Sequence, residues 1–233
     1  HHFYNYAMAP DNTQFLSYMA AKTERIGLLT GAVILPWHLQ PVRVVERMPL
    51  LDHLSRGRAI LGIGRGLARR EYLDFGVDMN EARGRFDEAA EIIIRGLETG
   101  VVEADGEFFR QRRVEIRPKP YDTRWRDRFY AVGMSSDSVP VVARIGARMM
   151  SFAQKPWEQM RPHFDTYRTL FEEHHQRAAP PPICVDFMCC DESAERTEQL
   201  AREHMANYYI TVMDHYEMAS GHFANLKGYG RRS

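Results

Sequence analysis

The sequence is poor in cysteine and has no excess of either charge. Only three of its 233 residues are cysteine (Cys184, Cys189 and Cys190). Three cysteines so close together cannot form a disulfide framework, which predicts a reducing compartment and a cytoplasmic protein. The 31 basic residues are balanced by 31 acidic ones. A net charge of zero argues against nucleic acid as a partner, because nucleic-acid-binding surfaces are normally basic.

Long apolar runs are also missing. No run approaches the roughly 20 apolar residues that span a bilayer, and no segment has the layout of a secretory signal peptide. We therefore expect no membrane partner. The chain opens with His1-His2-Phe3 and no methionine, which predicts a processed or truncated chain.

What the sequence does contain is a regular alternation of short apolar runs and amphipathic segments. The apolar runs are typical of buried parallel strands and lie at 26–35, 59–63, 129–132, 148–152 and 183–188. The segments with helical spacing lie at 44–54, 68–75, 80–97, 138–145, 157–170 and 193–209, with Asn80 expected as the cap of the third. This alternation predicts an α/β protein with a parallel sheet. It does not decide between an open doubly wound sheet and a (β/α)8 barrel.

Residues 100–128 interrupt this alternation. Their glycine, their charge and short runs such as Val114-Glu115-Ile116 predict a hairpin-like insertion that ends at Pro118 and Pro120. We expect residues 1–233 to form a single domain around it.

A glycine-rich turn, Gly62-Ile63-Gly64-Arg65-Gly66, follows the second predicted strand. It is not a dinucleotide fingerprint, because Leu67 stands where the third glycine is needed. In one interpretation the glycines let a ligand approach the backbone, beside an arginine suited to a phosphate. In the other, this is a tight turn with a solvated arginine.

A second polar turn, Gly133-Met134-Ser135-Ser136-Asp137-Ser138, also follows a predicted strand and precedes a helix. Hydroxyl groups and free backbone N–H groups at such a place can bind an anion. Ser135, Ser136 or Asp137 can equally serve as an ordinary helix cap. Together with Arg65, the turn suggests a phosphate clamp.

Histidines and cysteines offer two further candidates. His1-His2 is typical of a purification-tag remnant, a structural pair or a reactive imidazole at a strand end. The cysteines lack a histidine at zinc-site spacing, so we predict no metal site and interpret them as packing residues.

Several motifs, in this order, resemble the bacterial luciferase-like family of flavin-dependent monooxygenases. They are His1-His2-Phe3, Leu51-Asp52-His53-Leu54-Ser55-Arg56-Gly57-Arg58, Gly62-Ile63-Gly64-Arg65-Gly66, Phe75-Gly76-Val77-Asp78-Met79-Asn80, Val102-Glu103-Ala104-Asp105-Gly106 and Met134-Ser135-Ser136-Asp137-Ser138. The resemblance implies a (β/α)8 barrel of which the visible strands are the third to the seventh. The barrel is then incomplete, truncated at both ends of the chain.

The resemblance also implies the site residues. Reduced FMN would lie at the carboxyl ends of the strands, with Arg65, Ser135 and Ser138 on its phosphate. Met134 stands where the family has a glutamate, a contact that the backbone can still make. Gly31 and Ala32, at the end of the first predicted strand, fall where the family has a non-proline cis peptide beneath the flavin ring. His1 falls on the histidine that luciferases need for activity.

By this resemblance, the protein is expected to be an oxidoreductase that uses O2 and reduced FMN from a separate flavin reductase to oxygenate a small, mostly apolar substrate. A homodimer is expected. Two alternatives stay open: a deazaflavin (F420)-dependent hydride-transfer enzyme, and a flavin binder without activity. Gly64 replaces the cysteine that many luciferases carry, and the segment 36–41 is one residue longer and brings in Trp37, so light emission is not expected.

Overall fold

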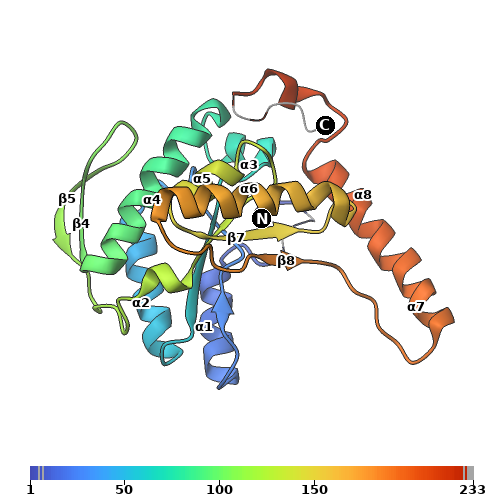
Figure 1. Ribbon diagram of the computed structural model, residues 1–233, viewed down its shortest axis with the longest axis horizontal. Coiled ribbons are helices and arrows are strands. Elements are labelled where there is room, and N and C mark those ends of the chain that lie inside the picture. The colour runs from blue at the N-terminus through green and yellow to red at the C-terminus, as the bar shows by residue number, and fades with distance from the viewer. Residues whose placement is uncertain (5, 7, 228, 230–233) are drawn as a thin grey trace.

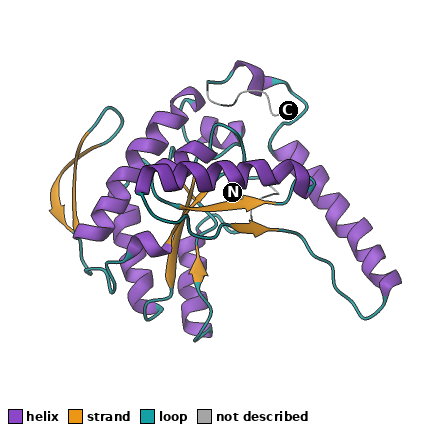
Figure 2. Ribbon diagram, viewed as in Figure 1, coloured by secondary structure: helices purple, strands orange, loops and turns teal. Residues whose placement is uncertain are grey.

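A parallel β-sheet lies at the centre of the computed structural model, which describes residues 1–4, 6, 8–227 and 229 (Figures 1 and 2). Its strands are β1 (Leu28–Leu29), β2 (Val33–Ile34), β3 (Ala59–Gly64), β6 (Phe129–Val132), β7 (Arg148–Phe152) and β8 (Ile183–Val185). Both β1 and β2 pair with β3, and β6, β7 and β8 follow in that order. The sheet is curled, so the predicted α/β class and the incomplete barrel are confirmed.

Helices connect successive strands of the sheet. They are α2 (Val42–Leu54), α3 (Arg69–Asp74), the 3₁₀ turn η1 (Met79–Glu81), α4 (Ala82–Thr99), the 3₁₀ turn η2 (Trp125–Arg128), α5 (Val139–Arg144) and α6 (Trp157–His175). Their apolar faces meet the sheet in one buried core that contains Val45, Leu61, Phe86, Phe129 and Phe171. This is the arrangement that the helical spacing of the apolar residues predicts.

The first predicted strand is two strands. The peptide bond between Gly31 and Ala32 is cis and lies between β1 and β2. Here the hydroxyl of Thr30 takes part in the pairing with β3. It accepts the N–H of Gly62 at 2.7 Å and donates to the carbonyl of Gly62 at 2.9 Å. The non-proline cis peptide that the resemblance implies at Gly31 and Ala32 is therefore confirmed, and it lies just after β1, where the predicted run 26–35 is interrupted.

Two helix starts differ from the sequence expectation. Helix α1 (Asn12–Lys22) was not anticipated; the carboxylate of Asp11 caps it by accepting the N–H groups of Thr13 and Gln14. Asn80 was expected to cap the long helix, which begins only at Ala82. The cap there is Asp78, whose carboxylate accepts the N–H of Asn80 at 2.8 Å and starts η1.

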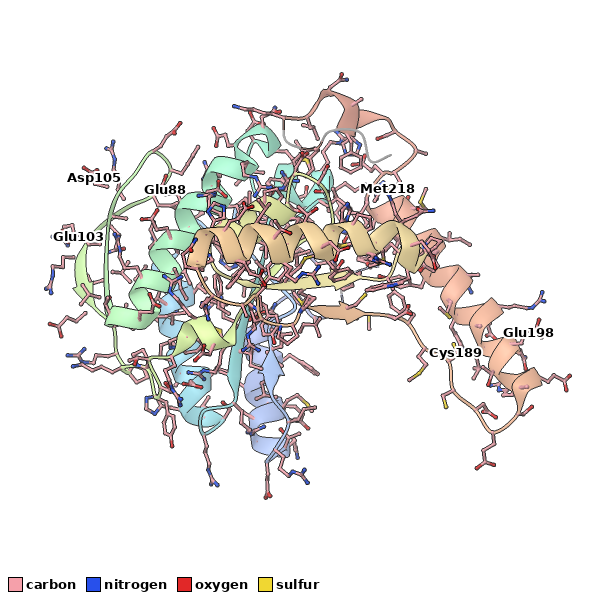
Figure 3. The ribbon with its side chains drawn as sticks, in the orientation of Figure 1. Glu88, Glu103, Asp105, Cys189, Glu198 and Met218 are labelled. Atoms are coloured by element: carbon pink, nitrogen blue, oxygen red, sulfur yellow. The ribbon has the colours of Figure 1, made fainter. Side chains whose placement is uncertain are left out.

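Residues 101–115 form an antiparallel hairpin of β4 (Val101–Asp105) and β5 (Arg110–Glu115), apart from the main sheet (Figure 1). Figure 3 places Glu88 of α4 next to it. The Glu88 carboxylate accepts the N–H groups of Phe108 and Phe109 at 3.1 and 2.8 Å. This buried end of the hairpin is thereby attached to the helix.

The C-terminal part extends away from the sheet. After β8 a linker leads to α7 (Ala194–Leu200), a π-helical turn η3 (Ala201–Met205), α8 (Ala206–His215) and the 3₁₀ turn η4 (His222–Asn225) (Figure 1). The helical segment that the sequence predicts at 193–209 thus continues to His215. The strand predicted at 183–188 ends at Val185, three residues before the predicted end. Cys184 and Cys190 are exposed and Cys189, on the linker in Figure 3, is partly exposed, so their interpretation as packing residues was wrong.

No helix in the described part of the chain combines the length and the apolar character that crossing a membrane requires.

Candidate functional site

The glycines of the turn after β3 are explained by the neighbouring strand. A Cβ on Gly62 would lie 2.1 Å from the carbonyl oxygen of Thr30, and one on Gly64 would lie 2.9 Å from Ile34. Gly66 has a φ of +81° and faces Ile34 and Trp37. These glycines therefore let the chain around the cis peptide approach β3. The space that a side chain would occupy on these glycines is filled by Thr30, Ile34 and Trp37, so no ligand approaches the backbone from that side.

Arg65 follows β3 directly and lies at the edge of the sheet where all the parallel strands end. Its guanidinium carbon is 3.8 Å from the centroid of the Tyr229 ring. Its backbone carbonyl accepts the hydroxyl of Tyr72, and the carbonyl of Gly66 accepts the hydroxyl of Tyr229 at 3.0 Å. Arg65 is thus held at the predicted position, in contact with a segment that is distant in sequence.

Arg83, in the first turn of α4, is a cation near Arg65 that sequence reasoning missed. Burial is the main cause that lowers the pKa of Arg83, and the positive charge of Arg65 is the second. Its Nη2 atom is buried and has no hydrogen-bond partner within the described ranges, although Nη1 lies 3.6 Å from Asp87. A negatively charged ligand near both arginines would supply the missing acceptor.

The predicted phosphate turn after β6 is next to Arg65, because β3 and β6 pair in parallel with Ile63 opposite Ala131. The turn is closed by the hydroxyl of Ser138, which accepts the N–H groups of Met134 and Ser135 at 3.0 and 2.9 Å. The hydroxyls of Ser135 and Ser138 are 3.0 Å apart. One oxygen atom thus already accepts two backbone donors here, as a phosphate oxygen would.

A pocket of about 200 Å³ lies beside the cis peptide. His1, His2, Ala32, Trp37 and Phe75 line one part of it, and Asp11, Asn12, His38 and Arg47 contribute polar groups. Ala32 is oriented here by the amide of Asn12, which donates to its carbonyl at 3.0 Å. His38 is largely buried, and burial is the main reason why its pKa falls to about 4. Gly31 is exposed, and a Cβ there would touch nothing within 4 Å.

His1 lies between two partners that the sequence did not reveal. Its Nδ1 is 3.2 Å from the carboxylate of Glu71, and its Nε2 is 2.9 Å from the hydroxyl of Tyr216. Glu71 also accepts the N–H of His2 at 2.5 Å. Only 1% of the Glu71 side chain is exposed. The buried carboxylate thus holds the imidazole at Nδ1, while Tyr216 contacts the other ring nitrogen, Nε2.

His215, the last residue of α8, completes this group. Its Nε2 is 3.7 Å from Glu71, and only 1% of its side chain is exposed. Its ring packs at 4.5 Å against Tyr6 and at 4.8 Å against His1. Desolvation is the main cause that lowers the pKa of His215. The group joins the N-terminus, α3 and the end of α8, which no sequence motif links.

The profile of the family described as Luciferase-like monooxygenase matches residues 1–232. The chain belongs to the luciferase-like monooxygenases. Among family relatives, the alkanal monooxygenase alpha chain of Photorhabdus luminescens is 25% identical over 232 residues, which are 97% of this chain and 64% of the relative. The chain therefore spans less than two thirds of the length of that relative.

Solved structures agree with membership in the luciferase-like family. Monooxygenase RslO1 from Streptomyces bottropensis superposes with a TM-score of 0.81 at 25% identity, over 95% of this chain and 68% of that one. The oxygenating constituent of 3,6-diketocamphane monooxygenase from Pseudomonas putida, a structure in complex with FMN, gives 0.78 at 15%, over 98% and 68%. An F420-dependent secondary alcohol dehydrogenase gives 0.70 at 16%, over 86% and 62%. The latter two likenesses concern the fold alone.

Proposed function

We propose that this luciferase-like protein is a flavin-dependent monooxygenase that uses reduced FMN and O2 to oxygenate a small, mostly apolar organic substrate. One observation carries the proposal. Arg65 and the turn of Met134, Ser135 and Ser138, which we assign to a phosphate, lie at the sheet edge at which His1 and Ala32 line a pocket. Such an edge is where (β/α)8 enzymes bind their ligands.

The residues present fit the phosphate of FMN. Arg83 has a buried nitrogen without an acceptor, and Arg65 is the second-largest cause of its lowered pKa. A phosphate between two guanidinium groups would relieve both conditions, because charge-assisted bonds to phosphate are strong. The N–H groups of Met134 and Ser135 are the natural donors to one phosphate oxygen, in place of the Ser138 hydroxyl that accepts them now.

Gly31 and Ala32 would then lie beneath the flavin ring, between the phosphate groups and the pocket. When bound, reduced FMN supplies the electrons that activate O2. The pocket of about 200 Å³ is smaller than the 300–1,000 Å³ typical of sites for drug-sized ligands. We assign it to a small substrate rather than to the cofactor, with Trp37 and Phe75, stacked at 5.5 Å, as its apolar wall.

In this proposal His1 is the acid–base residue. With a proton on Nδ1 donated to Glu71, the Nε2 lone pair accepts the Tyr216 hydroxyl. The two partners select one tautomer of the neutral imidazole, as second partners of catalytic histidines generally do. His1 can then take up or release a proton at Nε2 while Glu71 keeps the ring in place.

A deazaflavin is the second candidate cofactor, because the fold is shared with an F420-dependent dehydrogenase. The same sheet edge would bind it and the reaction would be hydride transfer. A flavin binder without activity is the third candidate, and Gly64, at the position of the luciferase cysteine, favours it. If no turnover is observed with any tested substrate and with either cofactor, the result favours that third function.

Binding and turnover of each cofactor distinguish these candidates. We expect Arg65→Ala to weaken FMN binding at least about tenfold, since it removes charge-assisted hydrogen bonds. Arg113→Ala, on the exposed strand β5, is the matched control. Oxygen consumption with reduced FMN, and none with reduced F420, is the expected result. An unchanged FMN dissociation constant in Arg65→Ala would refute the phosphate assignment.

We also propose the remaining family features for this chain. Residues 1–233 would form one domain of a barrel that is truncated at both ends, with its hairpin-like insertion at 100–128. A separate flavin reductase would supply reduced FMN, the protein would be a homodimer, and it would act in the cytoplasm. Size-exclusion chromatography with light scattering tests the dimer, and a coupled assay with a flavin reductase tests the supply.

A further inference from the structure

Three metal-ligating side chains meet beside the pocket. One ring nitrogen of His1, one of His215 and a carboxylate oxygen of Glu71 all lie within 4.8 Å of one another. They come from the N-terminus, from the end of α8 and from α3. The folded chain therefore brings together two imidazoles and one carboxylate that have no motif spacing in the sequence.

His215 lacks the partner that a buried imidazole needs. Neither of its ring nitrogens has a hydrogen-bond partner among the residues that the structure describes. The 3.7 Å between its Nε2 and Glu71 is too long for a hydrogen bond. Buried polar atoms are otherwise paired in nearly all cases. An atom that accepts the His215 lone pair would complete the site.

Glu71 supplies the negative charge. Its side chain is buried, and within the described part of the chain it faces the His2 N–H, His1 and His215. The nearby arginines are engaged elsewhere: Arg69 pairs with Glu217 at 2.6 Å, and Arg70 lies 3.4 Å from Asp214. A cation between the three side chains would neutralise the Glu71 carboxylate, since Arg69 and Arg70 pair with other carboxylates.

The spacing suits a transition metal. Bonds of about 2.0–2.1 Å in a tetrahedral site place ligand atoms roughly 3.3 Å apart. The separations from Glu71 to His1 and to His215 are 3.2 and 3.7 Å, and the two imidazole nitrogens lie within 4.8 Å of each other, so a metal requires the imidazoles to move closer together. Tyr216 already holds the other ring nitrogen of His1 at 2.9 Å, which is the outer contact that orients a ligating histidine. Two imidazoles favour Zn²⁺ or Co²⁺ over Mg²⁺ and Ca²⁺, which prefer oxygen.

We propose that His1, Glu71 and His215 bind one divalent transition-metal ion such as Zn²⁺. The fourth position faces the side on which His1 is exposed and takes a water molecule. On the function proposed above, the metal inhibits oxygenation, because an ion on Nδ1 leaves the proton on Nε2, so that His1 can no longer take up a proton there. Binding itself does not depend on that function, so the two proposals fail separately.

Calorimetric titration with Zn²⁺ tests the site. For the titration a few residues are added before His1, so that no free α-amine adjoins the imidazole. We expect one Zn²⁺ per chain with a micromolar or tighter dissociation constant. His215→Asn and Glu71→Gln, which nearly keep the side-chain size, should each weaken binding at least about tenfold. His2→Ala is the matched control, since the His2 ring packs on Phe75 at 4.8 Å and not on the cluster.

Circular dichroism confirms that each variant is folded. Co²⁺ provides a second readout on the unchanged chain, because a tetrahedral nitrogen–oxygen site gives visible absorption bands. Absence of both Zn²⁺ binding and Co²⁺ bands would overturn the proposal. So would Zn²⁺ binding that persists in His215→Asn and Glu71→Gln but is lost in His174→Ala, which would place the ion at the exposed His174.

Discussion

The guanidinium carbon of Arg65 stacks 3.8 Å from the ring centroid of Tyr229, so the last described residue contacts the predicted phosphate arginine. Tyr229 is buried and belongs to a small core with Trp37, Tyr72 and Met79. Its ring therefore restricts the Arg65 guanidinium group from one side. Cation–π contacts of this kind contribute about 0.5–2 kcal/mol, depending on desolvation.

Tyr229→Ala should weaken FMN binding about three- to tenfold, because Arg65 then loses its orientation. Tyr229→Phe keeps the ring and loses the hydroxyl that bonds to the Gly66 carbonyl and to the Tyr72 hydroxyl, so its affinity should stay within about twofold of the unchanged protein. Fluorescence titration with FMN measures both. Tighter binding in Tyr229→Ala would mean that the ring screens Arg65 instead of positioning it.

The pair of His1 and Glu71 gives a prediction about rate. His1→Ala should lower the oxygenation rate by about 10²–10⁴, the usual contribution of a general acid–base group. Glu71→Gln should lower it about 10- to 100-fold, because the amide no longer accepts the Nδ1 proton with a full charge. FMN affinity should be unchanged in both variants. His174→Ala is the control on an exposed histidine. A full rate in His1→Ala would remove His1 from the mechanism.

Local patterns predicted most of the sheet and its helices, because these strands are short runs buried by helices with an apolar face. Helix α1 escaped because only Thr13 and Ala20 of its residues are buried, which is too few to give a periodic pattern. The division of the first strand escaped as well. At the division, the side-chain hydroxyl of Thr30 takes the place of backbone hydrogen bonds to Gly62 of β3. An apolar run in the sequence does not indicate such a substitution.

The site divides in the same way. Arg65, Ser135 and Ser138 could be predicted because each follows a strand in sequence, where parallel sheets place their ligands. Glu71 was missed because it is one of several charged residues in 69–74, and only the fold buries it. His215 and Tyr216 reach His1 through α8, which depends on the packing of the whole chain. The glycines of 62–66 could have been assigned to strand contact only once Thr30 was placed.

His38 predicts a pH dependence of stability. Its pKa is about 4 in the folded chain, against 6.5 for an ordinary histidine, mainly because it is buried. The unfolded chain therefore takes up a proton near pH 6.5 while the folded chain does not. The stabilisation is present above pH 6.5, is lost as the pH falls from 6.5 to about 4, and amounts to at most about 3 kcal/mol.

His38→Gln should remove this contribution. The difference in unfolding free energy between His38→Gln and the unchanged protein, measured in urea at several pH values, should change between pH 6.5 and 4 and be constant above that range. Acidic residues affect both proteins alike and cancel in this difference. A difference that does not vary with pH would show that His38 is accessible to protons in the folded chain.

Asp52 and Arg128 form a buried ion pair at the opposite end of the strands from the proposed cofactor. Arg128 donates to both carboxylate oxygens, at 2.6 and 3.2 Å, and to the carbonyls of Gly57, Ala59 and Asp122. The Asp52 side chain is fully buried. Asp52, in the Leu51–Arg58 motif that carries part of the family resemblance, therefore stabilises the fold.

Asp52→Ala should lower the unfolding free energy by about 3–5 kcal/mol, because it leaves a guanidinium group buried without its counter-charge. Asp127→Ala, on an exposed carboxylate of η2, should cost less than about 0.5 kcal/mol. The double change Asp52→Leu and Arg128→Met should recover much of the loss, since a buried pair and an apolar pair of similar volume are often equally stable. Urea denaturation measures all three. A double variant as unstable as Asp52→Ala would mean that the carbonyls that Arg128 binds, rather than the ion pair, need the guanidinium group.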